Sequence, residues 1–490
     1  MMDLIEKINH WGETAPNHIA HICGDQSITY RDLRERSDAL AAYFWRTLPH
    51  DHSPVALLGH KEAEMIIGFL GAIKSGHSYI PLDTSLPAYR IKNVLEIAKS
   101  PPVLTARQIK DALAEPIVQM NFNGCKLSSQ QPWYIIFTSG STGEPKGVVI
   151  TKSCLENFVN WMLSEHTFSD LGEVFLNQAP FSFDLSVMDL YLSLVTGGTL
   201  FSISKEVQAE PRQLFLTFAQ SEISSWVSTP SFARLCLAEP TFNRQMLPGL
   251  KRFLFCGETL APAVASDLLD RFPDSEIWNT YGPTETTVAT TSVRIDRQTL
   301  VRYSPLPVGY PKPDSRLFVV DERDRPLDEG EQGEIIITGP NLSPGYLNRP
   351  DLTARAFFKL GDKPAYRTGD RGHFQNGLLF FDGRIDNQIK LHGYRIELGD
   401  IEANLRQVPG IQDAVVLPII KDGIPEALAA LIILTDQKTG SDFEIIRGIK
   451  RELKLRLPAY MLPRSYYFLN EFPMTPNGKA DRRKLAERIS

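Results

Sequence analysis

A ten-residue stretch, TSGSTGEPKG from Thr138 to Gly147, carries the clearest chemistry in the chain. It combines four hydroxyl side chains, three glycines and a lysine, and these are groups that bind phosphate oxygens. A Walker A loop opens a helix at its lysine, but here Pro145 precedes the lysine and the β-branched run at 148–150 favours a strand. A plain Ser/Gly-rich turn is the alternative, and it gives no reason for the lysine. The sequence therefore predicts a phosphate-binding loop whose contacts are Thr138, Ser139, Gly140, Ser141, Thr142, Gly143 and Lys146.

Helical and strand-like patterns alternate along the chain, which predicts layers of an α/β protein. A capping box of Thr29 and Asp32 predicts a helix from about Tyr30. The segment HKEAEMIIGFLGAIKSG predicts a second helix that stops at Gly76, followed by a short strand in SYIPLD. Near the C-terminus, helical spacing predicts a helix that Pro458 ends, with one apolar face made of Ile446, Ile449, Leu453 and Leu457.

Three apolar strands run into polar, glycine-containing residues. They are Ile135–Phe137 before the loop, the strand in KRFLFCGE and the strand in EIWNTYGPTE. Ligands of open α/β sheets bind beyond the carboxyl ends of strands. We therefore expect these three strand ends to share one crevice.

Composition excludes several classes of protein. The chain has 490 residues, of which 42% are apolar and 22% charged, which is typical of a globular protein of about two to three domains. No apolar run approaches the roughly 20 residues of a transmembrane helix, and the N-terminus lacks a signal-peptide pattern, so we expect a cytoplasmic location. Five scattered cysteines without a C-x-x-C pair argue against a disulfide framework or a zinc site. The net charge of -6 gives no indication of nucleic-acid binding.

Six segments resemble, in the same order, the motifs of the adenylate-forming superfamily, which includes acyl-CoA synthetases, luciferases and amino-acid adenylation domains. The segments are TSGSTGEPKG, NTYGPTE, YRTGDRG, GRIDNQIKLHGYRIELGDIE, LPAYMLP and PNGKADRRKL. The resemblance covers essentially the whole chain. It implies an α/β fold with a large N-terminal adenylation domain of layered sheets and helices, residues 1–385. A small mobile α+β C-terminal domain, residues 386–490, would follow.

The resemblance implies a reaction in two steps that uses ATP and Mg²⁺. A carboxylate and ATP give an acyl-adenylate and pyrophosphate, and a thiol then takes the acyl group. Thr284 would contact the α-phosphate, and Glu285 would bind Mg²⁺, which prefers oxygen ligands shared with nucleotides. The ring of Tyr281 would lie against adenine and Asn279 would bond its edge, within the motif Asn279, Thr280, Tyr281, Gly282 and Pro283. Alone, Tyr281 would more simply be a core aromatic.

Two further motifs are implied to complete the nucleotide site. Asp370 in YRTGD would accept hydrogen bonds from the ribose hydroxyls, and Arg384 would contact ribose or phosphate. The residues before Arg384 would line the same side, namely Phe381, Asp382 and Gly383.

Lys479 is the residue that the resemblance implies for catalysis of the first step. Asn477 and Gly478 form a strong tight-turn signal, which would present Lys479 near the tip of a hairpin. There its cation would reach both the substrate carboxylate and the α-phosphate. Asp386 matches the hinge about which the small domain rotates, which would withdraw Lys479 and admit the thiol.

Asp184, in the segment FSFD, indicates an amino-acid substrate. It matches the position at which amino-acid-activating members bind the substrate ammonium, and a buried carboxylate without such a partner would be costly. Asp189, in the same run, is given no role. With SSWVSTPSFARLCL and RFLFCGETL, this region resembles the D-alanine–D-alanyl carrier protein ligases of teichoic acid D-alanylation. In that family's pattern, Cys256 would favour D- over L-alanine and Val288 would exclude larger amino acids.

The thiol implied by this family belongs to the phosphopantetheine arm of a small acidic carrier protein. Residues 387–490 carry 16 Lys+Arg against 13 Asp+Glu, which is compatible with an acidic partner but is by itself explained more simply by ordinary surface scatter. Three alternatives remain: an L-amino-acid adenylating enzyme of peptide-synthetase type, an acyl-CoA synthetase, and an inactive adenylate-binding sensor. The first shares every ATP motif and Asp184. Asp184 argues against the second, and intact Glu285, Asp370 and Lys479 argue against the third.

Overall fold

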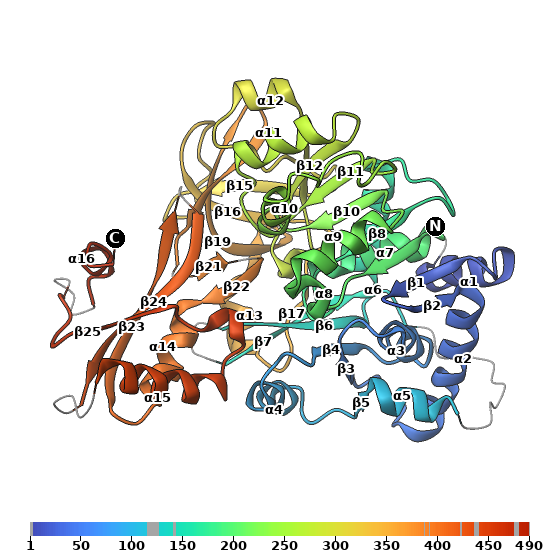
Figure 1. Ribbon diagram of the computed structural model, residues 1–490, viewed down its shortest axis with the longest axis horizontal. Coiled ribbons are helices and arrows are strands. Elements are labelled where there is room, and N and C mark those ends of the chain that lie inside the picture. Colours follow the sequence, from blue (N-terminus) through green and yellow to red (C-terminus); the bar gives the residue numbers. More distant parts are fainter. Residues whose placement is uncertain are drawn as a thin grey trace. The chain divides into compact units, whose positions relative to one another are not determined.

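The computed structural model describes residues 3–114, 127–140, 144–386, 388–391, 393–421, 424–435, 441–474 and 480–489. Its contacts divide the chain into two compact units, whose elements are labelled in Figure 1. The first unit comprises Met1–Thr84, Ala98–Ile136 and Gly147–Gly383, and the second comprises Ser85–Ile97, Phe137–Lys146 and Arg384–Ser490. No helix in the described ranges is both long and apolar enough to cross a membrane.

The first unit contains a nine-stranded sheet. Its strands are β1 (Ile19–Cys23), β2 (Gln26–Thr29), β8 (Val174–Asn177), β9 (Thr199–Ser202), β10 (Ser225–Ser228), β11 (Arg252–Phe255), β12 (Glu276–Tyr281), β13 (Thr291–Ile295) and β14 (Tyr310–Pro311). They lie in the order β14-β13-β12-β11-β10-β8-β9-β1-β2. The strands from β12 to β1 are parallel, whereas β13, β14 and β2 are antiparallel at the edges.

Side chains of the parallel strands supply two cores, one on each face of this sheet. Leu176 and Phe253 pack in one core with the helices α9 (Pro211–Ala219), α10 (Pro230–Leu237) and α11 (Pro262–Arg271). Phe175 and Leu254 belong to the other core, which includes α7 (Leu185–Val195), every residue of which is buried. Neighbouring residues of a strand point to opposite faces, so these continuously apolar strands are covered on both sides.

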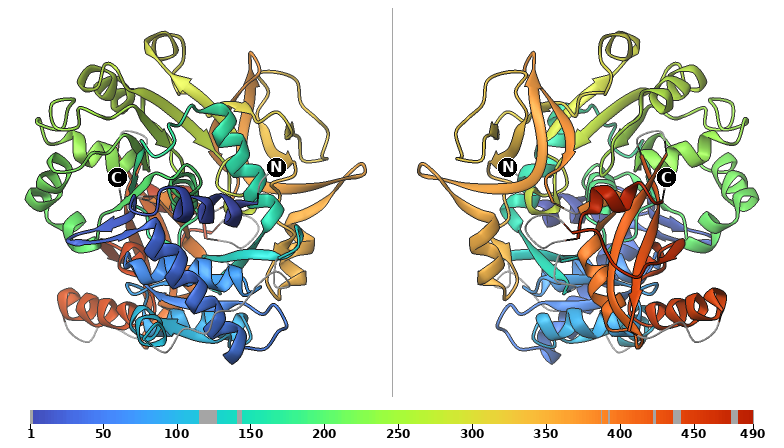
Figure 2. Two further views of the ribbon diagram at one scale, coloured as in Figure 1. Left: turned by 90° about the vertical axis from the view of Figure 1, so that its right-hand side faces the viewer. Right: turned by 90° about the vertical axis from the view of Figure 1, so that its left-hand side faces the viewer.

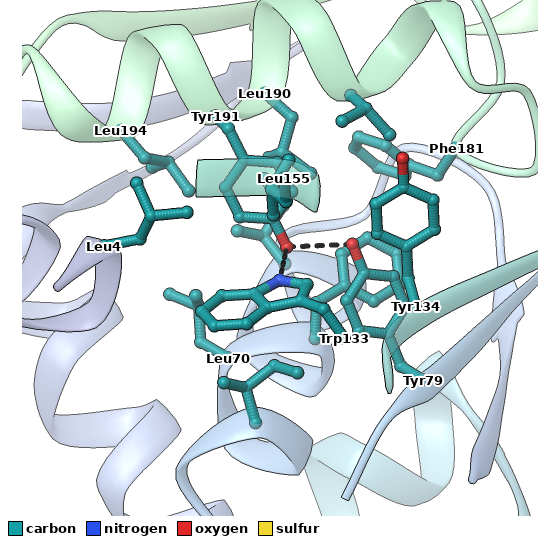
Figure 3. Packing of buried hydrophobic residues seen from close by; sticks show 14 of the residues in the cluster. Leu4, Leu70, Tyr79, Trp133, Tyr134, Leu155, Phe181, Leu190, Tyr191 and Leu194 are labelled. Carbon is teal, nitrogen blue, oxygen red and sulfur yellow. Dashed lines mark hydrogen bonds between the residues drawn. The ribbon is translucent and has the colours of Figure 1, made fainter. Parts of the chain in front are cut away.

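A second sheet of the first unit faces the core around α7. It has six strands in the order β17-β7-β6-β4-β3-β5, namely β3 (Val55–Gly59), β4 (Tyr79–Asp83), β5 (Val103–Thr105), β6 (Pro132–Thr138), β7 (Lys146–Thr151) and β17 (Gly345–Tyr346). In that core the Tyr191 hydroxyl accepts a hydrogen bond from Trp133 Nε1 at 2.6 Å and lies 2.8 Å from the Tyr79 hydroxyl (Figure 3). The three polar atoms therefore satisfy one another inside an apolar cluster.

A third, strongly twisted antiparallel sheet appears in light orange in Figure 2. Its strands are β15 (Arg316–Val320), β16 (Gly333–Thr338), β18 (Phe357–Leu360), β19 (Lys363–Gln375) and β20 (Leu378–Arg384), with β19 paired to β16, β18 and β20. The predicted ribose ligand Asp370 lies on β19, and the predicted residues 381–384 end β20. The other helical segments of this unit are α1 (Leu4–Thr14), α2 (Tyr30–Thr47), α3 (Ala63–Lys74), α5 (Ala106–Ala112), α6 (Lys152–Glu165), α8 (Lys205–Ala209), α12 (Arg297–Arg302), α13 (Pro350–Ala356) and the 3₁₀ turn η1 (Thr284–Thr286).

Several predicted elements are confirmed. α2 begins after the predicted capping box, in which the Asp32 amide donates to Thr29 Oγ1 and the Thr29 amide donates to the Asp32 carboxylate. α3 ends two residues before Gly76, whose φ of +85° is the left-handed geometry of a helix stop. The predicted strands in SYIPLD and after Lys146 are β4 and β7.

The three strand ends that we expected to share a crevice belong to two sheets. β11 and β12 are parallel neighbours in the nine-stranded sheet, whereas β6 lies in the six-stranded sheet. A single sheet edge therefore does not unite all three ends.

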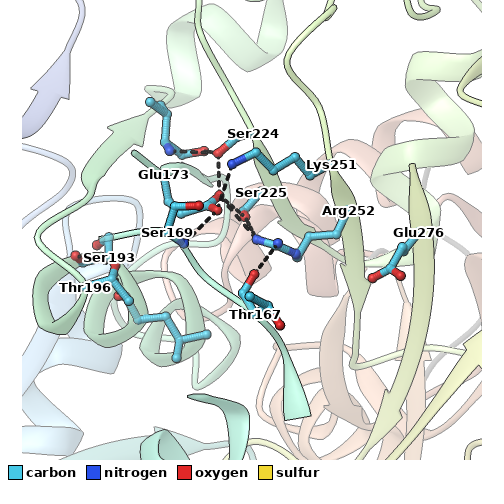
Figure 4. Close-up of polar contacts among 12 residues, drawn as sticks. Thr167, Ser169, Glu173, Ser193, Thr196, Ser224, Ser225, Lys251, Arg252 and Glu276 are labelled. Carbon is cyan, nitrogen blue, oxygen red and sulfur yellow. Dashed lines mark hydrogen bonds and ion pairs between the residues drawn. The ribbon is translucent and has the colours of Figure 1, made fainter. Parts of the chain in front are cut away.

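A buried ionic cluster joins the amino ends of three neighbouring parallel strands (Figure 4). Glu173, directly before β8, accepts hydrogen bonds from the hydroxyls of Ser224 at 2.6 Å and Ser225 at 3.1 Å. It also pairs with Lys251 at 3.0 Å and Arg252 at 3.2 Å. The cluster lies at the opposite ends of the strands from the predicted site residues, so we assign it to the stability of the sheet.

The second unit centres on the antiparallel hairpin of β23 (Ile411–Lys421) and β24 (Ile424–Leu434), extended by parallel β25 (Ser465–Phe468). Alternate residues of β23 face opposite ways. Val416 packs with α14 (Leu398–Arg406) and α15 (Asp442–Lys454), whereas Leu417 packs with Phe472 and α16 (Arg482–Ala486). In Figure 1, α16 accordingly lies on one side of the hairpin and α14 and α15 on the other. The unit also contains α4 (Ala88–Ile97), β21 (Gln388–Leu391), β22 (Tyr394–Glu397) and η2 (Ala459–Met461).

The predicted C-terminal helix is α15, and its predicted end is wrong. The helix stops at Lys454 rather than at Pro458, and residues 455–457 continue as a turn in which the Leu457 amide still donates to the Leu453 carbonyl. Ile449, Leu453 and Leu457 are buried as predicted, but Ile445 rather than Ile446 packs against the cluster. Ile445 and Ile446 lie four and three residues before Ile449, and because both spacings are helical, spacing alone does not distinguish them.

Candidate active site

The carboxyl ends of β11 and β12 bring the predicted adenine and pocket residues together. Phe255 and Asn279 are register partners in these parallel strands, and the Thr280 hydroxyl donates to the Phe255 carbonyl at 2.8 Å. Cys256 follows directly after β11, and Tyr281 ends β12. The two polar strand ends therefore lie side by side, as expected.

Asn279, the predicted ligand of the adenine edge, is a buried amide with a fixed orientation. Its side chain is 2% exposed, and Nδ2 donates to the Pro307 carbonyl at 2.8 Å, which fixes the orientation of the amide. Its Oδ1 is buried and has no hydrogen-bond partner among the described residues. Buried acceptors are rarely left unpaired. The exocyclic amine of adenine is a donor that would pair with this oxygen. The residue therefore fits the nucleotide that the motif implies.

Tyr281 and Asp370, predicted for adenine and ribose, are bonded to each other. The Tyr281 hydroxyl donates to Asp370 Oδ2 at 2.6 Å, and both side chains are buried. The Tyr281 ring packs in a hydrophobic cluster, with its centre 6.2 Å from that of Phe381. The Tyr281 hydroxyl therefore fixes the orientation of the Asp370 carboxylate. The motif did not indicate this role for Tyr281.

The two residues between Phe381 and Arg384 shape the end of β20. Asp382 Oδ2 lies 2.7 Å from His373 Nδ1 on the neighbouring strand β19. Gly383 has a φ of +110°, which a residue with a side chain rarely adopts. The glycine is therefore required by the backbone at this point.

The NTYGPTE motif continues into η1, which contains the predicted residues Thr284 and Glu285. The Thr284 hydroxyl donates to Asp184 Oδ2 at 2.7 Å, and Glu285 is 0% exposed with Oε1 accepting from the Tyr346 hydroxyl at 2.7 Å. A Cβ on Gly282 would lie 2.6 Å from Ala289 Cα, so the turn needs glycine there. The ATP motif and the predicted ammonium ligand thus meet in one place.

Cys256 and Val288, the two predicted pocket residues, are in contact. Cys256 Sγ lies 3.5 Å from the Val288 carbonyl oxygen, and both side chains are buried. Thr287 and Val288 both have left-handed backbones, with φ of +57° and +68°. Such geometry is strained for β-branched residues and concentrates at functional sites. No sequence signal indicates it, because β-branched residues normally avoid this region.

The donors present suit Mg²⁺ only if it is shared with a nucleotide. No group of three or more His, Cys, Asp or Glu in the described part of the chain is arranged to hold a metal ion. Glu285 supplies one buried carboxylate, which the Tyr346 hydroxyl orients. Mg²⁺ commonly binds one or two carboxylates together with phosphate oxygens and water, so this donor set fits that mode.

The remaining predicted site residues fall in the second unit or outside the described residues. The Ser139 hydroxyl donates to the Arg395 carbonyl at 2.9 Å and accepts from the Glu397 amide at 3.2 Å, while the buried Thr138 Oγ1 has no hydrogen-bond partner in the ranges that the structure describes. A Cβ on Gly140 would lie 2.1 Å from the Glu144 carbonyl oxygen, so glycine is required. Lys146 opens β7. Four predicted residues lie outside the described residues, namely Ser141, Thr142, Gly143 and Lys479.

Arg384 and Asp386 form a two-pronged ion pair in the second unit. Arg384 Nε and Nη2 donate to the two carboxylate oxygens of Asp386 at 2.8 and 2.5 Å. Burial acts to raise the pKa of Asp386, but the hydrogen bonds and charge of Arg384 prevail and hold the pKa below its usual range. The predicted hinge residue Asp386 is therefore the ion-pair partner of the arginine in its own motif.

The comparisons with known proteins define the class. The chain matches the AMP-binding enzyme family over residues 8–347 and the AMP-binding enzyme C-terminal domain over residues 400–479. The Vibrio cholerae adenylation domain AlmE, solved in complex with glycyl-adenosine-5'-phosphate, superposes with a TM-score of 0.85 at 22% identity and covers 99% of this chain and 97% of its own. The protein belongs to the AMP-binding enzyme family and has its mixed α/β adenylation fold, which confirms the predicted fold class.

Full-length relatives define a narrower family for the chain. The D-alanine–D-alanyl carrier protein ligase of Bacillus cereus (strain B4264) is 45% identical over 504 residues, and that of Bacillus anthracis (strain CDC 684 / NRRL 3495) is 46% identical over 503 residues. Each alignment covers 100% of both chains. Within the AMP-binding enzymes, the chain is a member of the D-alanine–D-alanyl carrier protein ligase family, and the resemblance drawn from its motifs is confirmed.

Proposed function

We propose that the protein is an AMP-forming ligase that activates D-alanine with ATP. The products of the first step are D-alanyl-adenylate and pyrophosphate. The D-alanyl group then passes to the phosphopantetheine thiol of a small acidic carrier protein, which supplies D-alanylation of teichoic acids. Full-length kinship with D-alanine–D-alanyl carrier protein ligases supports the reaction, and the geometry below supports the roles of individual residues.

One observation carries the proposal: the Thr284 hydroxyl and the Asp184 carboxylate are hydrogen-bonded at 2.7 Å. Thr284 belongs to the ATP motif, and Asp184 is the proposed ligand of the substrate ammonium. An ionised carboxylate can accept several hydrogen bonds, so the bond to Thr284 is compatible with binding of an ammonium group by Asp184. An amino acid bound there would lie beside the α-phosphate that its carboxylate attacks.

The contact between Cys256 and Val288 supports selection of a small D-amino acid. Both side chains are buried, and Val288 is held in an unusual left-handed conformation. Cys256 would occupy the space into which the methyl group of L-alanine points, and Val288 would exclude longer side chains. Exclusion by a wall discriminates more strongly than the attraction of one methyl group, which is worth only about 1–3 kcal/mol.

Each part of the nucleotide has a proposed ligand in this chain. Asn279 would bond the adenine edge, Asp370 the ribose, and the loop at 138–146 the phosphates. Glu285 would hold Mg²⁺, which when bound would neutralise charge on the phosphates. Lys479 would add a cation to the developing charge at the α-phosphate.

We further propose that residues 1–385 bind ATP and the amino acid, and that residues 386–490 form a mobile domain that carries Lys479. Support comes from the separate family matches, which end at residue 347 and resume at residue 400. Asp386 would be the hinge, and rotation there would replace Lys479 by the carrier thiol. The use of ATP supports a cytoplasmic location. The cysteines that the structure describes are free, which fits a reducing compartment; they are Cys23, Cys154, Cys236 and Cys256.

ATP–pyrophosphate exchange with a panel of amino acids tests the proposal. D-alanine is expected to support the fastest exchange, with L-alanine, glycine and larger amino acids far slower. Transfer to a carrier protein bearing phosphopantetheine is then measured by the gain of a D-alanyl thioester. Preference for an L-amino acid would contradict the proposal and support the alternative function, that of a stand-alone L-amino-acid adenylating enzyme of peptide-synthetase type.

A further inference from the structure

Lys61 is buried in the first unit, outside the residues predicted to bind substrates. It lies between β3 and α3 and is 1% exposed. Its Nζ donates to Asn177 Oδ1 at 2.5 Å and to the Ala179 carbonyl, and it lies 4.6 Å from the centre of the Phe181 ring. All three contacts are in the segment that joins the end of β8 to the start of α7. One ammonium therefore holds this segment at three points.

Asn177 connects the ammonium to the helix that follows. Its Nδ2 donates to Asp189 Oδ1, on α7, at 2.8 Å, while its Oδ1 also accepts from the Ser202 hydroxyl at 2.7 Å. Asp189 is 0% exposed, and its Oδ2 has no hydrogen-bond partner within the described residues. The segment before α7 is thus anchored on its strand side by Asn177 and on its helix side by Asp189.

Asp184 lies between these two anchors. It is the N-cap residue of α7, yet its carboxylate makes no capping hydrogen bond and accepts from the Thr284 hydroxyl instead. An N-cap carboxylate usually accepts from amides of the first helical turn, which would fix its direction locally. The first turn of α7 therefore does not fix the direction of this side chain, and the path of the preceding segment sets where the carboxylate meets Thr284.

Burial and neighbouring charges act in opposite directions on the ionisable groups of this cluster. Burial lowers the pKa of Lys61 to about 8, and the carboxylates of Asp189 and Asp83 act in the opposite direction. Burial also raises the pKa of Asp189 well above its usual range, and Lys61 opposes that rise. Apolar side chains of similar volume are often at least as stable as a buried charge pair. Stability alone therefore does not explain the lysine, whereas its directed donors do fix the path of the segment.

We propose that Lys61 is a positioning residue for amino-acid binding. Together with Asn177 and Asp189, it fixes residues 178–184 so that the Asp184 carboxylate is aimed at the substrate ammonium. The proposal rests on the role proposed above for Asp184. Lys61 itself contacts neither ATP nor the amino acid in this arrangement.

The test compares the substrate dependence of ATP–pyrophosphate exchange in Lys61→Met and the unaltered protein. Methionine keeps much of the length of the lysine but has no charge and no donor. The KM for D-alanine is expected to rise roughly 10- to 100-fold, because small displacements of a binding group have effects of that size. The KM for ATP is expected to change by less than about threefold, because the proposed nucleotide ligands other than Thr284 lie on segments away from residues 178–184.

Lys74→Met is the matched control. Lys74 is also buried in the first unit, on α3, and its Nζ donates to the Ser37 hydroxyl at 2.8 Å and pairs with Asp38 at 2.7 Å. Its loss removes a buried cation without touching the segment before α7. We expect the control to lower the thermal midpoint and to leave the KM for D-alanine unchanged.

A double variant, Lys61→Met with Asp189→Asn, separates positioning from stability. Removing both charges avoids an unpaired buried carboxylate, so its thermal midpoint is expected to exceed that of Lys61→Met while its KM for D-alanine stays high. If Lys61→Met does not fold, the KM for D-alanine is measured in the double variant instead. A D-alanine KM near that of the unaltered protein in either variant, or an equal rise in Lys74→Met, would overturn the proposal. If the unaltered protein uses another amino acid, the proposed substrate is wrong and the same KM comparison is made with that amino acid.

Discussion

Thr284 and Asp184 are 100 positions apart in the sequence, and their side chains meet at 2.7 Å. One belongs to the ATP motif and the other to the segment that indicates an amino-acid substrate. The hydrogen bond between them would couple the proposed nucleotide and amino-acid sites, because each side chain restrains the direction of the other. Changes at Asp184 are therefore the most direct probe of amino-acid binding.

Asp184→Asn is expected to raise the KM for D-alanine roughly 10- to 100-fold, because hydrogen bonds to charged groups contribute about 1.5–3 kcal/mol. Asparagine keeps an acceptor for Thr284, so the KM for ATP is expected to change by less than about threefold. ATP–pyrophosphate exchange with each substrate varied in turn measures both values. Asp296→Asn, at the exposed N-cap of α12, is the control and is expected to change neither. Equal rises for D-alanine and ATP would remove Asp184 from its role.

Cys256→Ala is expected to raise the use of L-alanine relative to D-alanine by about tenfold, since the smaller side chain opens the space for the L-methyl group. The ratio of kcat/KM for the two enantiomers in the exchange assay measures the change. Cys236→Ala is a matched control, because Cys236 is also a buried free cysteine but lies in the core around α10. An unchanged ratio in Cys256→Ala would exclude the residue from stereoselection.

Glu285→Gln is expected to raise the Mg²⁺ concentration that gives half-maximal exchange by roughly 10- to 100-fold. Tyr346→Phe is expected to have a smaller effect in the same direction, because the Tyr346 hydroxyl orients Glu285 Oε1 at 2.7 Å. Titration of Mg²⁺ after treatment with EDTA measures both effects. Unaltered Mg²⁺ dependence in Glu285→Gln would show that the metal, if required, is held elsewhere.

The sequence predicted local structure and motif membership well, and long-range partners poorly. The capping box of Thr29 and Asp32 and the glycine stop at Gly76 depend on residues within a few positions of one another, and both are confirmed. The pocket roles proposed for Cys256 and Val288 come from matching segments to one family, and the structure adds that the two residues are in contact. Each of these has a signal that is visible in the one-dimensional pattern.

The features that escaped prediction have no such signal. Tyr346 and Glu285 are 61 positions apart, and nothing in the segment around Tyr346 indicates a carboxylate partner. No motif gives Asp189 a role, and only the fold shows that it is buried, bonded to Asn177 and close enough to Lys61 to interact with its charge. Burial of a charged residue depends on elements that converge in three dimensions, so it emerges only with the structure.

Glu173→Gln is expected to lower the free energy of unfolding by roughly 3–5 kcal/mol at pH 7, because it leaves Arg252 buried without its charge partner. Burial acts to raise the pKa of Glu173, but the Ser224 hydrogen bond and the charges of Arg252 and Lys251 hold it below 4.5. The unfolded chain thus binds this proton more tightly than the folded protein. The contribution is complete above about pH 4.5 and is lost as the pH falls through the lower folded-state pKa.

Urea unfolding between pH 3 and pH 7 measures this dependence. The difference between the unaltered protein and Glu173→Gln is expected to shrink in the acid range. Glu276→Gln is the control, because the pair of Glu276 and Arg294 at 3.1 Å is partly exposed and is expected to contribute less than about 1 kcal/mol. A difference that is constant across the pH range would mean that the Glu173 charge does not stabilise the sheet.

Lys479→Ala separates the two half-reactions. Loss of its cation is expected to lower D-alanine-dependent exchange by roughly 100- to 1,000-fold, since charge at the α-phosphate would lose a preorganised partner. Transfer of D-alanine from preformed adenylate to the carrier thiol is expected to stay within about threefold, because the hinge model withdraws Lys479 before that step. Lys484→Ala is the control from the same basic segment, on the exposed surface of α16, and is expected to change neither rate. An equal loss of both half-reactions in Lys479→Ala would contradict rotation about Asp386, because one fixed arrangement would then serve both steps.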